Sequence, residues 1–117
     1  MKDTFTIYNL PKISLNQWYS GKHWSVRKKI KDTYKTLLRG YKVILNENES
    51  VHTEYRFGFS KRPLDASNTI AMVKMIEDCL FVDDSYKIVK SVKVSSEKSK
   101  RDFVEITMYS ELFENPE

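Results

Sequence analysis

The feature that most constrains the fold is a run of alternating side chains at residues 51–60, with the sequence VHTEYRFGFS. Apolar residues and one threonine occupy the odd positions of this run, and polar residues or glycine occupy the even ones. A period of two is that of a β-strand whose two faces have different surroundings. The run therefore predicts a strand with one face against a core, so other segments must cover one side of a sheet.

The first half of the chain supplies a strand and a helix for this arrangement. A short strand is expected at residues 5–10, before Pro11, because apolar and β-branched residues gather there. A helix is expected after Ser25, whose hydroxyl is a suitable N-cap, and Gly40 is a candidate for its end. Residues 41–45 continue the helical spacing of apolar side chains but also fit the start of a strand, and both assignments stay open.

The second half of the chain supplies another helix and two more strands. The helix is predicted over residues 69–80, and apolar segments at 86–94 and 103–109 flank the charged turn SSEKSKRD. We interpret these two segments and their turn as a β-hairpin. The order of elements allows an α/β or an α+β domain, and we expect α+β: a small mixed sheet of about four strands covered by two helices.

Length and composition limit the class of protein. A chain of 117 residues has the size of one domain, so we expect a single domain over residues 1–117. No run of about 18 apolar residues is present, and the N-terminal segment lacks the apolar core of a signal peptide, so no membrane partner is expected. The only cysteine, Cys79, cannot form an internal disulfide and is interpreted as a packing residue. Together these features predict a cytoplasmic protein.

Positive charge is concentrated in one segment of the chain. The net charge is +4, yet residues 21–40 hold seven basic side chains against Asp32 alone. A focused basic segment favours a polyanionic partner, although a solvated helix face gives the same pattern. The residues that we expect to face DNA are Asn16, Lys22, Arg27, Lys28, Lys29 and Lys31.

Two further groups of residues have a DNA-binding and a structural interpretation. Trp18, Tyr19 and Trp24 can stack on unpaired bases, and the alternative is packing in the core, which we favour slightly for Trp24. The basic residues of the turn at 95–102 can contact phosphate, but a solvated turn is the preferred interpretation there. His52 lies on the predicted solvent face of its strand and is given no role.

The segment RPLDASNTIAMVKMIEDCLFVDDS, residues 62–85, combines an amphipathic helix with acidic ends. Ser67 or Asn68 is the expected N-cap. A helical wheel places the core face at Met72, Val73, Ile76, Cys79 and Leu80, opposite a stripe formed by Ser67, Ala71, Lys74 and Asp78. Asp65 precedes the helix, where the helix dipole favours a negative charge.

Two adjacent carboxylates follow the same helix, where the dipole does not favour them. Asp83 and Asp84 repel each other unless a cation or a basic group stabilises them. Carboxylates alone, without a cluster of Cys and His, are ligands typical of Mg²⁺, and Mn²⁺ is the alternative. Acids at both ends of one helix could hold the ion against a phosphate, and Lys74 could then stabilise the developing negative charge.

With these residues the chain resembles the RusA-type Holliday junction resolvases. The resemblance rests on LDASN at 64–68, on Lys74, on Asp78 and on the segment DDS at 83–85. The segment SLNQWYSGKHWSVRKKIKD, residues 14–32, is similar to the early part of that family. The similarity extends from about Ile7 to Met108. Many members have a second aspartate where this chain has Ser67.

The resemblance implies a RusA-like endonuclease domain that acts as a homodimer on four-way DNA junctions and nicks two opposed strands with Mg²⁺. It assigns metal binding to Asp65 and to Asp83 or Asp84, with Asp78 as a weaker candidate. It assigns catalysis to these acids and to Lys74, and DNA contact to Asn68. Members of this size are frequent in phages, so the resemblance implies the cytoplasm of a bacterium or of a phage-infected host. The alternatives are a DNA-binding protein of the same fold without cleavage and, third, a protein whose basic helix binds an acidic protein.

Overall fold

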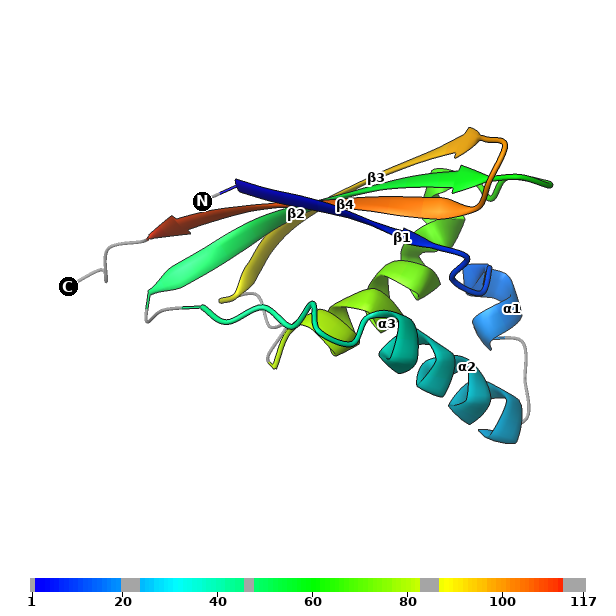
Figure 1. Cartoon of the computed structure of the whole chain (residues 1–117), viewed down its shortest axis with the longest axis horizontal. Coiled ribbons are helices and arrows are strands. Elements are labelled where there is room, and N and C mark those ends of the chain that lie inside the picture. Colours follow the sequence, from blue (N-terminus) through cyan, green and yellow to red (C-terminus); the bar gives the residue numbers. More distant parts are fainter. Residues whose placement is uncertain (1, 20–23, 46–47, 83–86, 113–117) are drawn as a thin grey trace.

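A computed structural model describes residues 2–19, 24–45, 48–82 and 87–112 (Figure 1). These residues form four strands, three α-helices and one 3-10 helix, which is an α+β fold as predicted. In chain order the elements are β1 (Lys2–Tyr8), α1 (Leu15–Tyr19), α2 (Trp24–Leu37), β2 (Glu49–Phe59), η1 (Ala66–Thr69), α3 (Ile70–Leu80), β3 (Val89–Lys98) and β4 (Phe103–Leu112).

The four strands form one mixed sheet in the order β1-β4-β2-β3. Strand β4 pairs antiparallel with both β1 and β2, and β3 pairs parallel with β2. On the open face of the sheet, Arg56 of β2 bonds to Glu97 of β3 at 2.7 Å and to Glu105 of β4 at 3.3 Å. A mixed sheet of four strands was expected, and the structure confirms it.

The predicted hairpin between residues 86–94 and 103–109 is wrong, because β2 lies between β3 and β4. Strand β2 buries its odd-numbered side chains from Val51 to Phe59, whereas no side chain of β3 is buried. The more apolar strand therefore takes a central position, and the more polar β3 takes an edge. Helix α3 connects β2 to β3 and allows them to run parallel, as parallel neighbours require a crossover connection.

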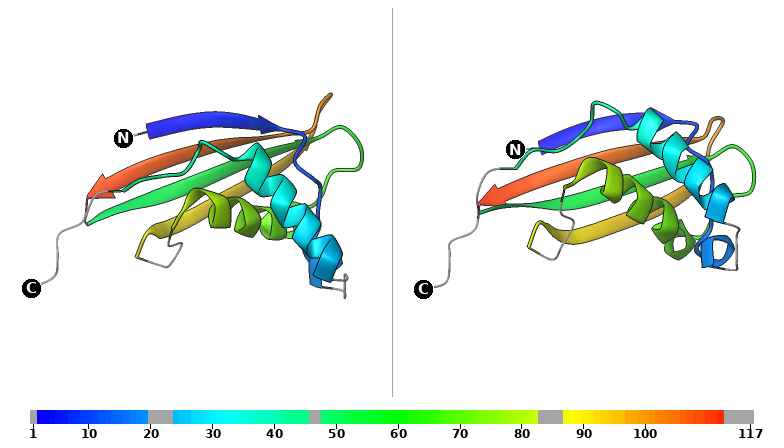
Figure 2. Two further views of the ribbon diagram at one scale, coloured as in Figure 1. Left: turned by 60° about the horizontal axis from the view of Figure 1, so that its bottom comes forward. Right: turned by 90° about the horizontal axis from the view of Figure 1, so that it is seen from below.

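All three helices lie on one face of the sheet, with α3 next to the sheet and α2 beside α3 (Figure 2). Helix α1 packs against η1 and α3. The core lies between the sheet and α3, and includes Tyr55, Phe57, Ile76, Leu80 and Ile106. The two long helices cover one side of the sheet, as predicted.

Helix α3 is buried on more of its circumference than the helical wheel indicated. Ala71 was assigned to the polar stripe, yet it is buried with Met72 and Val73. The wheel assumed one buried face, but α1 and α2 cover a second flank of the helix. Within 70–80, only Lys74 and Asp78 are exposed, and Cys79 is half-buried.

The ends of the helices also differ from the prediction. Helix α2 begins at Trp24, so Ser25 lies inside its first turn and is not the N-cap. The N-cap of α3 is Thr69 rather than Ser67 or Asn68, because the 3-10 turn η1 precedes the helix. After α2 the chain turns at Gly40, whose φ of 92° is a conformation that favours glycine.

Residues 41–45 form neither a helix nor a strand. The Val43 backbone N–H donates a hydrogen bond to the Leu80 carbonyl at 2.7 Å, so this segment satisfies a carbonyl in the last turn of α3. The ring of Tyr41 stacks on Phe5 of β1 at 4.6 Å between centroids. The segment thus joins the end of α3 to the edge strand β1.

Two buried tyrosine hydroxyls tie the helices to the rest of the core. Tyr34 of α2 donates to the Pro11 carbonyl at 2.6 Å, and Tyr55 of β2 donates to the Glu77 carboxyl of α3 at 3.2 Å. Burial, and next the charge of Glu77, raises the pKa of Tyr55 far above its ordinary value, so it stays a proton donor. Each bond satisfies a polar group that would otherwise be costly to bury.

Asp102, just before β4, provides a pH test of the fold. Its Oδ1 accepts bonds from the Ser60 backbone N–H at 2.7 Å and from the Ser60 hydroxyl at 2.9 Å. The backbone bond is the main reason why the pKa of Asp102 lies below its ordinary value. A carboxylate with a lowered folded-state pKa stabilises the fold above about pH 4, and this contribution is lost as the pH falls through the lowered pKa.

We therefore expect the free energy of unfolding of Asp102→Asn to fall less steeply than that of the wild type below about pH 4. Urea titrations at a series of pH values measure this slope. Asp3→Asn, which removes an exposed carboxylate of β1, is the control for the loss of one negative charge. Equal slopes for wild type and Asp102→Asn would contradict the assignment.

Candidate functional site

Helix α2 holds the basic surface that the sequence predicted. Its fourteen residues carry five basic side chains against Asp32 alone, so this one helix accounts for the whole net charge of +4. Tyr34 anchors the helix in the core, and the side chains of Lys28, Lys29, Lys31 and Lys35 are exposed. Lys28, Lys29 and Lys31, which were predicted to face DNA, therefore lie on the surface. Lys22, also predicted to face DNA, lies outside the described residues.

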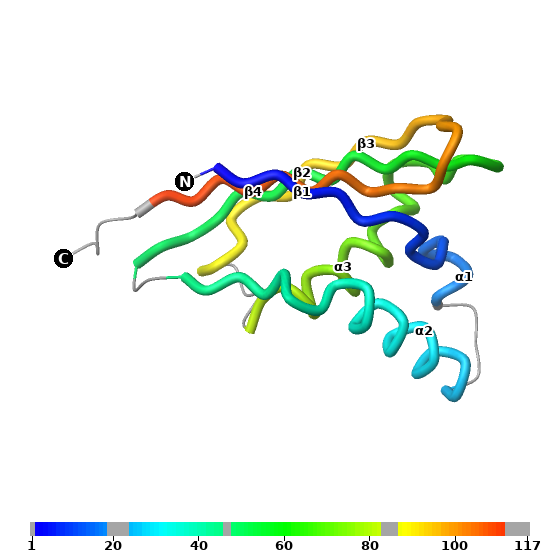
Figure 3. The backbone as a smooth tube through the Cα atoms, in the orientation of Figure 1, coloured from blue at the N-terminus to red at the C-terminus, as the bar shows by residue number. Residues whose placement is uncertain are grey.

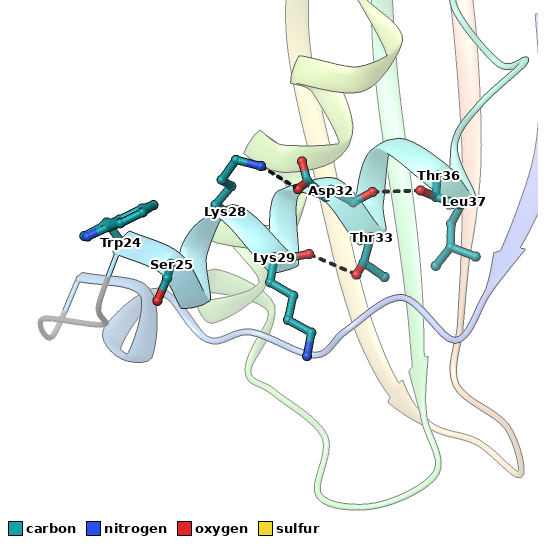
Figure 4. Close-up of a pocket in the computed structure, with 8 residues that line it drawn as sticks. All are labelled: Trp24, Ser25, Lys28, Lys29, Asp32, Thr33, Thr36 and Leu37. Carbon is teal, nitrogen blue, oxygen red and sulfur yellow. Dashed lines mark hydrogen bonds and ion pairs between the residues drawn. The ribbon is translucent and has the colours of Figure 1, made fainter.

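The outer side of α2 carries a shallow hollow of about 460 Å³ (Figure 4). Two adjacent rows of side chains line it, and within each row successive residues are one helical turn apart. These residues are Trp24, Ser25, Lys28, Lys29, Asp32, Thr33, Thr36 and Leu37. Lys28 pairs with Asp32 at 3.1 Å, and both groups are largely exposed. The Trp24 side chain is 71% exposed, so core packing is the wrong interpretation for this residue.

Arg27 differs from the other basic residues of α2, because its side chain turns toward α1. The guanidinium donates a hydrogen bond to the Trp18 carbonyl at 2.8 Å and lies over the Trp18 ring, 5.4 Å from its centroid. Both residues are half-buried. Arg27 therefore holds α1 against α2, and Trp18 has the packing role that was the alternative to base stacking. The side chain of Tyr19 lies outside the described part of the chain.

A groove between α2 and α3 brings the basic helix beside the predicted catalytic helix. Lys31, Tyr34 and Lys35 line one wall, and Met75, Asp78 and Cys79 line the other, around a volume of about 220 Å³. Lys74 is exposed one turn before Asp78 on α3, so it lies on the same stripe of that helix. Burial, and next the charge of Asp78, raises the pKa of the Cys79 thiol, which suits packing rather than nucleophilic chemistry.

Asn16, Asp65 and Asn68 lie near the N-terminal end of the η1–α3 segment. Helix α1 packs against η1, so Asn16 comes to the end of the molecule that holds Asn68. Asp65 is exposed directly before η1, and its carbonyl accepts the Asn68 backbone N–H at 2.8 Å. The Asp65 carboxylate makes no capping hydrogen bond to η1, so it does not serve as the N-cap acceptor of this turn.

The η1–α3 segment separates Asp65 from the end of α3. Four residues of 3-10 helix and eleven of α-helix lie between Asp65 and Phe81, which gives a length of roughly 25 Å. Asp83 and Asp84 lie outside the described residues, so the ligand roles of Asp65, Asp83 and Asp84 stay predictions.

The described residues do not contain a metal site by themselves. Nowhere in residues 2–19, 24–45, 48–82 and 87–112 do three side chains of the His, Cys, Asp or Glu type come together in a way that could hold an ion. Asp65 and Asp78 are both exposed and retain carboxylate oxygens of the kind that Mg²⁺ prefers. Any site formed with Asp65 thus needs further ligands, either from residues beyond the described ranges or from a second chain.

Sequence reasoning missed two groups of polar residues. Glu77 is buried against Tyr55, and its position four residues after Val73 and three before Leu80 already placed it on the core face of the helix. His52 lies between Ser91 at 2.6 Å and Glu111 at 3.0 Å, which links β2 to both of its neighbours. No signal in the sequence gives that triplet, because it depends on the strand order.

Comparison with known proteins does not extend this assignment. No protein-family model matches the sequence, and no curated protein matches it significantly. Among the helices that the structure describes, none has the length and apolar character needed to cross a membrane.

The role of Arg27 gives a test with a matched control. Arg27→Gln removes a bond between a charged donor and the Trp18 carbonyl, so the free energy of unfolding should fall by about 1.5–3 kcal/mol. Lys31→Gln removes the same charge from an exposed site and should change it by less than about 0.5 kcal/mol. Urea unfolding measures both values, and equal values would mean that Arg27 has no structural role.

Proposed function

We propose that this protein is a Mg²⁺-dependent, structure-selective endodeoxyribonuclease that acts as a homodimer on four-way DNA junctions and nicks two opposed strands. The observation that supports this most is the groove between α2 and α3, which joins the basic helix to the stripe that carries Lys74 and Asp78. Among the residues described, this arrangement puts exposed lysines of α2 beside candidate catalytic groups of α3. We infer that the protein acts in the cytoplasm of a bacterium or of a phage-infected host.

Binding is attributed to the exposed lysines of α2. Lys28, Lys29 and Lys31 neutralise phosphates, and the counterions they release from DNA supply much of the affinity. Asn16 and Asn68 add hydrogen-bonding groups at the end where Asp65 lies. Affinity should therefore fall steeply as the salt concentration rises.

Lys74 is assigned to charge stabilisation during hydrolysis. Its ammonium group stands on the exposed stripe of a helix whose remaining surface is packed, so the protein fixes its backbone position. An ammonium group held there can stabilise the negative charge that develops on a phosphate oxygen or on the leaving oxygen. Asp78, one turn later, faces Lys31 and Lys35 across the groove and keeps the local charge from being wholly positive.

The metal requirement leads to the dimer. We propose that Asp65 and the Asp83–Asp84 pair bind one ion from different copies of the chain, because η1 and α3 hold Asp65 and Phe81 roughly 25 Å apart within one chain. A two-fold axis would generate two equivalent sites of this kind, which matches the need for two symmetric nicks. When bound, Mg²⁺, or Mn²⁺ in its place, would neutralise a phosphate oxygen and activate a water molecule.

A DNA-binding protein without cleavage is the second candidate. It is favoured by the exposed hydroxyl of Ser67, which stands where a further carboxylate would have completed an acidic cluster with Asp65. Junction affinity alone would then be the activity of the protein, with the same basic helix as its surface. A basic helix that binds an acidic protein is the third candidate.

Lys74→Ala separates catalysis from binding. We expect nicking of a synthetic four-way junction in Mg²⁺ to fall roughly 100-fold or more, because a charge-stabilising group is lost from the transition state. Junction affinity in EDTA should fall only a few-fold. Gel analysis of nicked strands and fluorescence anisotropy measure the two quantities, and Lys93→Ala, at an exposed position of β3, is the control.

Equal loss of nicking and affinity would make Lys74 a phosphate contact only. Tight junction binding by the wild type without any nicking would support the second candidate instead of the nuclease. The absence of any salt-sensitive DNA binding would leave the acidic protein partner.

A further inference from the structure

Three connecting segments meet at the end of the sheet where β1 ends and β3 turns into β4, at the right of Figure 1. The Asn9 backbone N–H donates to the Asp102 carbonyl at 3.1 Å, and the Ser60 backbone N–H donates to the Asp102 carboxylate at 2.7 Å. The Ser99 backbone N–H donates to the Phe59 carbonyl at 2.9 Å. Residues 9–12, 60–62 and 98–102 are thereby tied into one unit, with Asp102 at its centre.

This unit carries six exposed basic side chains from distant parts of the sequence, namely Lys12, Lys61, Arg62, Lys98, Lys100 and Arg101. We call these six residues the basic loop platform. The only acidic residue in the three segments is Asp102, and its carboxylate is already bonded to Ser60. The sequence showed only the turn at 95–102, and the structure adds the other two segments.

Several of the six side chains are held in place rather than freely extended. Lys98 donates to the Lys61 carbonyl at 3.1 Å, and Lys12 donates to the Arg62 carbonyl. The Arg101 guanidinium lies over the Tyr8 ring at 3.9 Å from its centroid. Asp102 interacts electrostatically with Lys12 and Lys61, but one carboxylate offsets only part of six positive charges, so this arrangement suits a ligand with several negative charges.

The platform adjoins the predicted catalytic end of the molecule. Arg62 precedes Asp65 by three residues, and Ser96 of β3 donates to the Leu64 carbonyl between them. The tube in Figure 3 shows these loops and α1 at the same end of the molecule, with α2 extending below them. A nucleic acid bound on the platform would therefore pass close to Asp65 and would leave the outer side of α2 open.

We propose that the basic loop platform binds the sugar–phosphate backbone of a duplex DNA arm, as a second contact separate from α2. Duplex DNA carries one charge per about 1.7 Å of helix axis, and its spaced phosphates match a surface of spaced cations. A branched substrate offers two arms that diverge from one point, and two separate basic surfaces hold two arms at once. The proposal rests on the proposed action on branched DNA, and it adds the surface that holds the second arm.

The test compares two double variants with the same change in charge. Lys61→Gln with Lys100→Gln removes two charges from the platform, and Lys2→Gln with Lys93→Gln removes two exposed charges from strands β1 and β3. Affinity for a four-way junction and for a linear duplex is measured by fluorescence anisotropy in EDTA across a salt series. Because no metal is present, the result does not depend on nicking.

The platform variant should bind the junction and the duplex about tenfold more weakly at low salt, and its slope of log affinity against log salt should fall by about two. The control variant should bind like the wild type. Equal losses in both variants would mean that only net charge matters, and wild-type binding by the platform variant would also overturn the proposal. Thermal melting of each variant checks that the fold is retained.

A parallel nicking assay of the same variants in Mg²⁺ distinguishes the platform from the nuclease. If the wild type never nicks but the platform variant loses DNA affinity, DNA binding by the platform is supported and the nuclease proposal is contradicted. If the wild type nicks junctions and the platform variant binds and nicks equally well, DNA binding by the platform is contradicted and the nuclease proposal is supported.

Discussion

The burial of α3 against the sheet is the constraint on which the rest of the structure depends. Seven of its side chains are buried, and each large apolar one contributes roughly 1.5–3 kcal/mol when it leaves water. Because the sheet covers one flank and the other helices cover another, the exposed stripe shrinks to Lys74 and Asp78. The same packing holds η1 and α3 in one segment of roughly 25 Å between Asp65 and Phe81.

Features that depend on local periodicity were predictable from the sequence. The alternation at 51–60 gave the central strand, and the spacing of apolar residues gave both long helices, because each pattern follows from the geometry of one element. The hairpin was wrong because strand order is a long-range property, decided by which strand buries most surface. The same limit applies to Arg27, whose partner Trp18 lies in another helix, and to the triplet around His52.

The charged surfaces of the molecule are distributed unevenly along the sheet. The basic loop platform and the start of α2 lie toward one end of the sheet, whereas the groove that Lys31 and Lys35 share with Asp78 lies beside the C-terminal half of α3. Asp65 belongs to the end with the platform, and the chain reaches Val82 at the other. In the proposed dimer, one chain would supply Asp65 and a second copy related by a two-fold axis would supply the Asp83–Asp84 pair.

The most direct measurement of this account is complementation between two inactive chains. Asp65→Asn chains are mixed under exchange conditions with chains that carry Asp83→Asn and Asp84→Asn, and nicking of a four-way junction is measured. If the site is shared, random pairing restores one intact site in each mixed dimer, about a quarter of the wild-type number of sites, and produces mainly single nicks. If the mixture stays as inactive as each parent while the wild type nicks, the acids do not act across two chains and the account is contradicted.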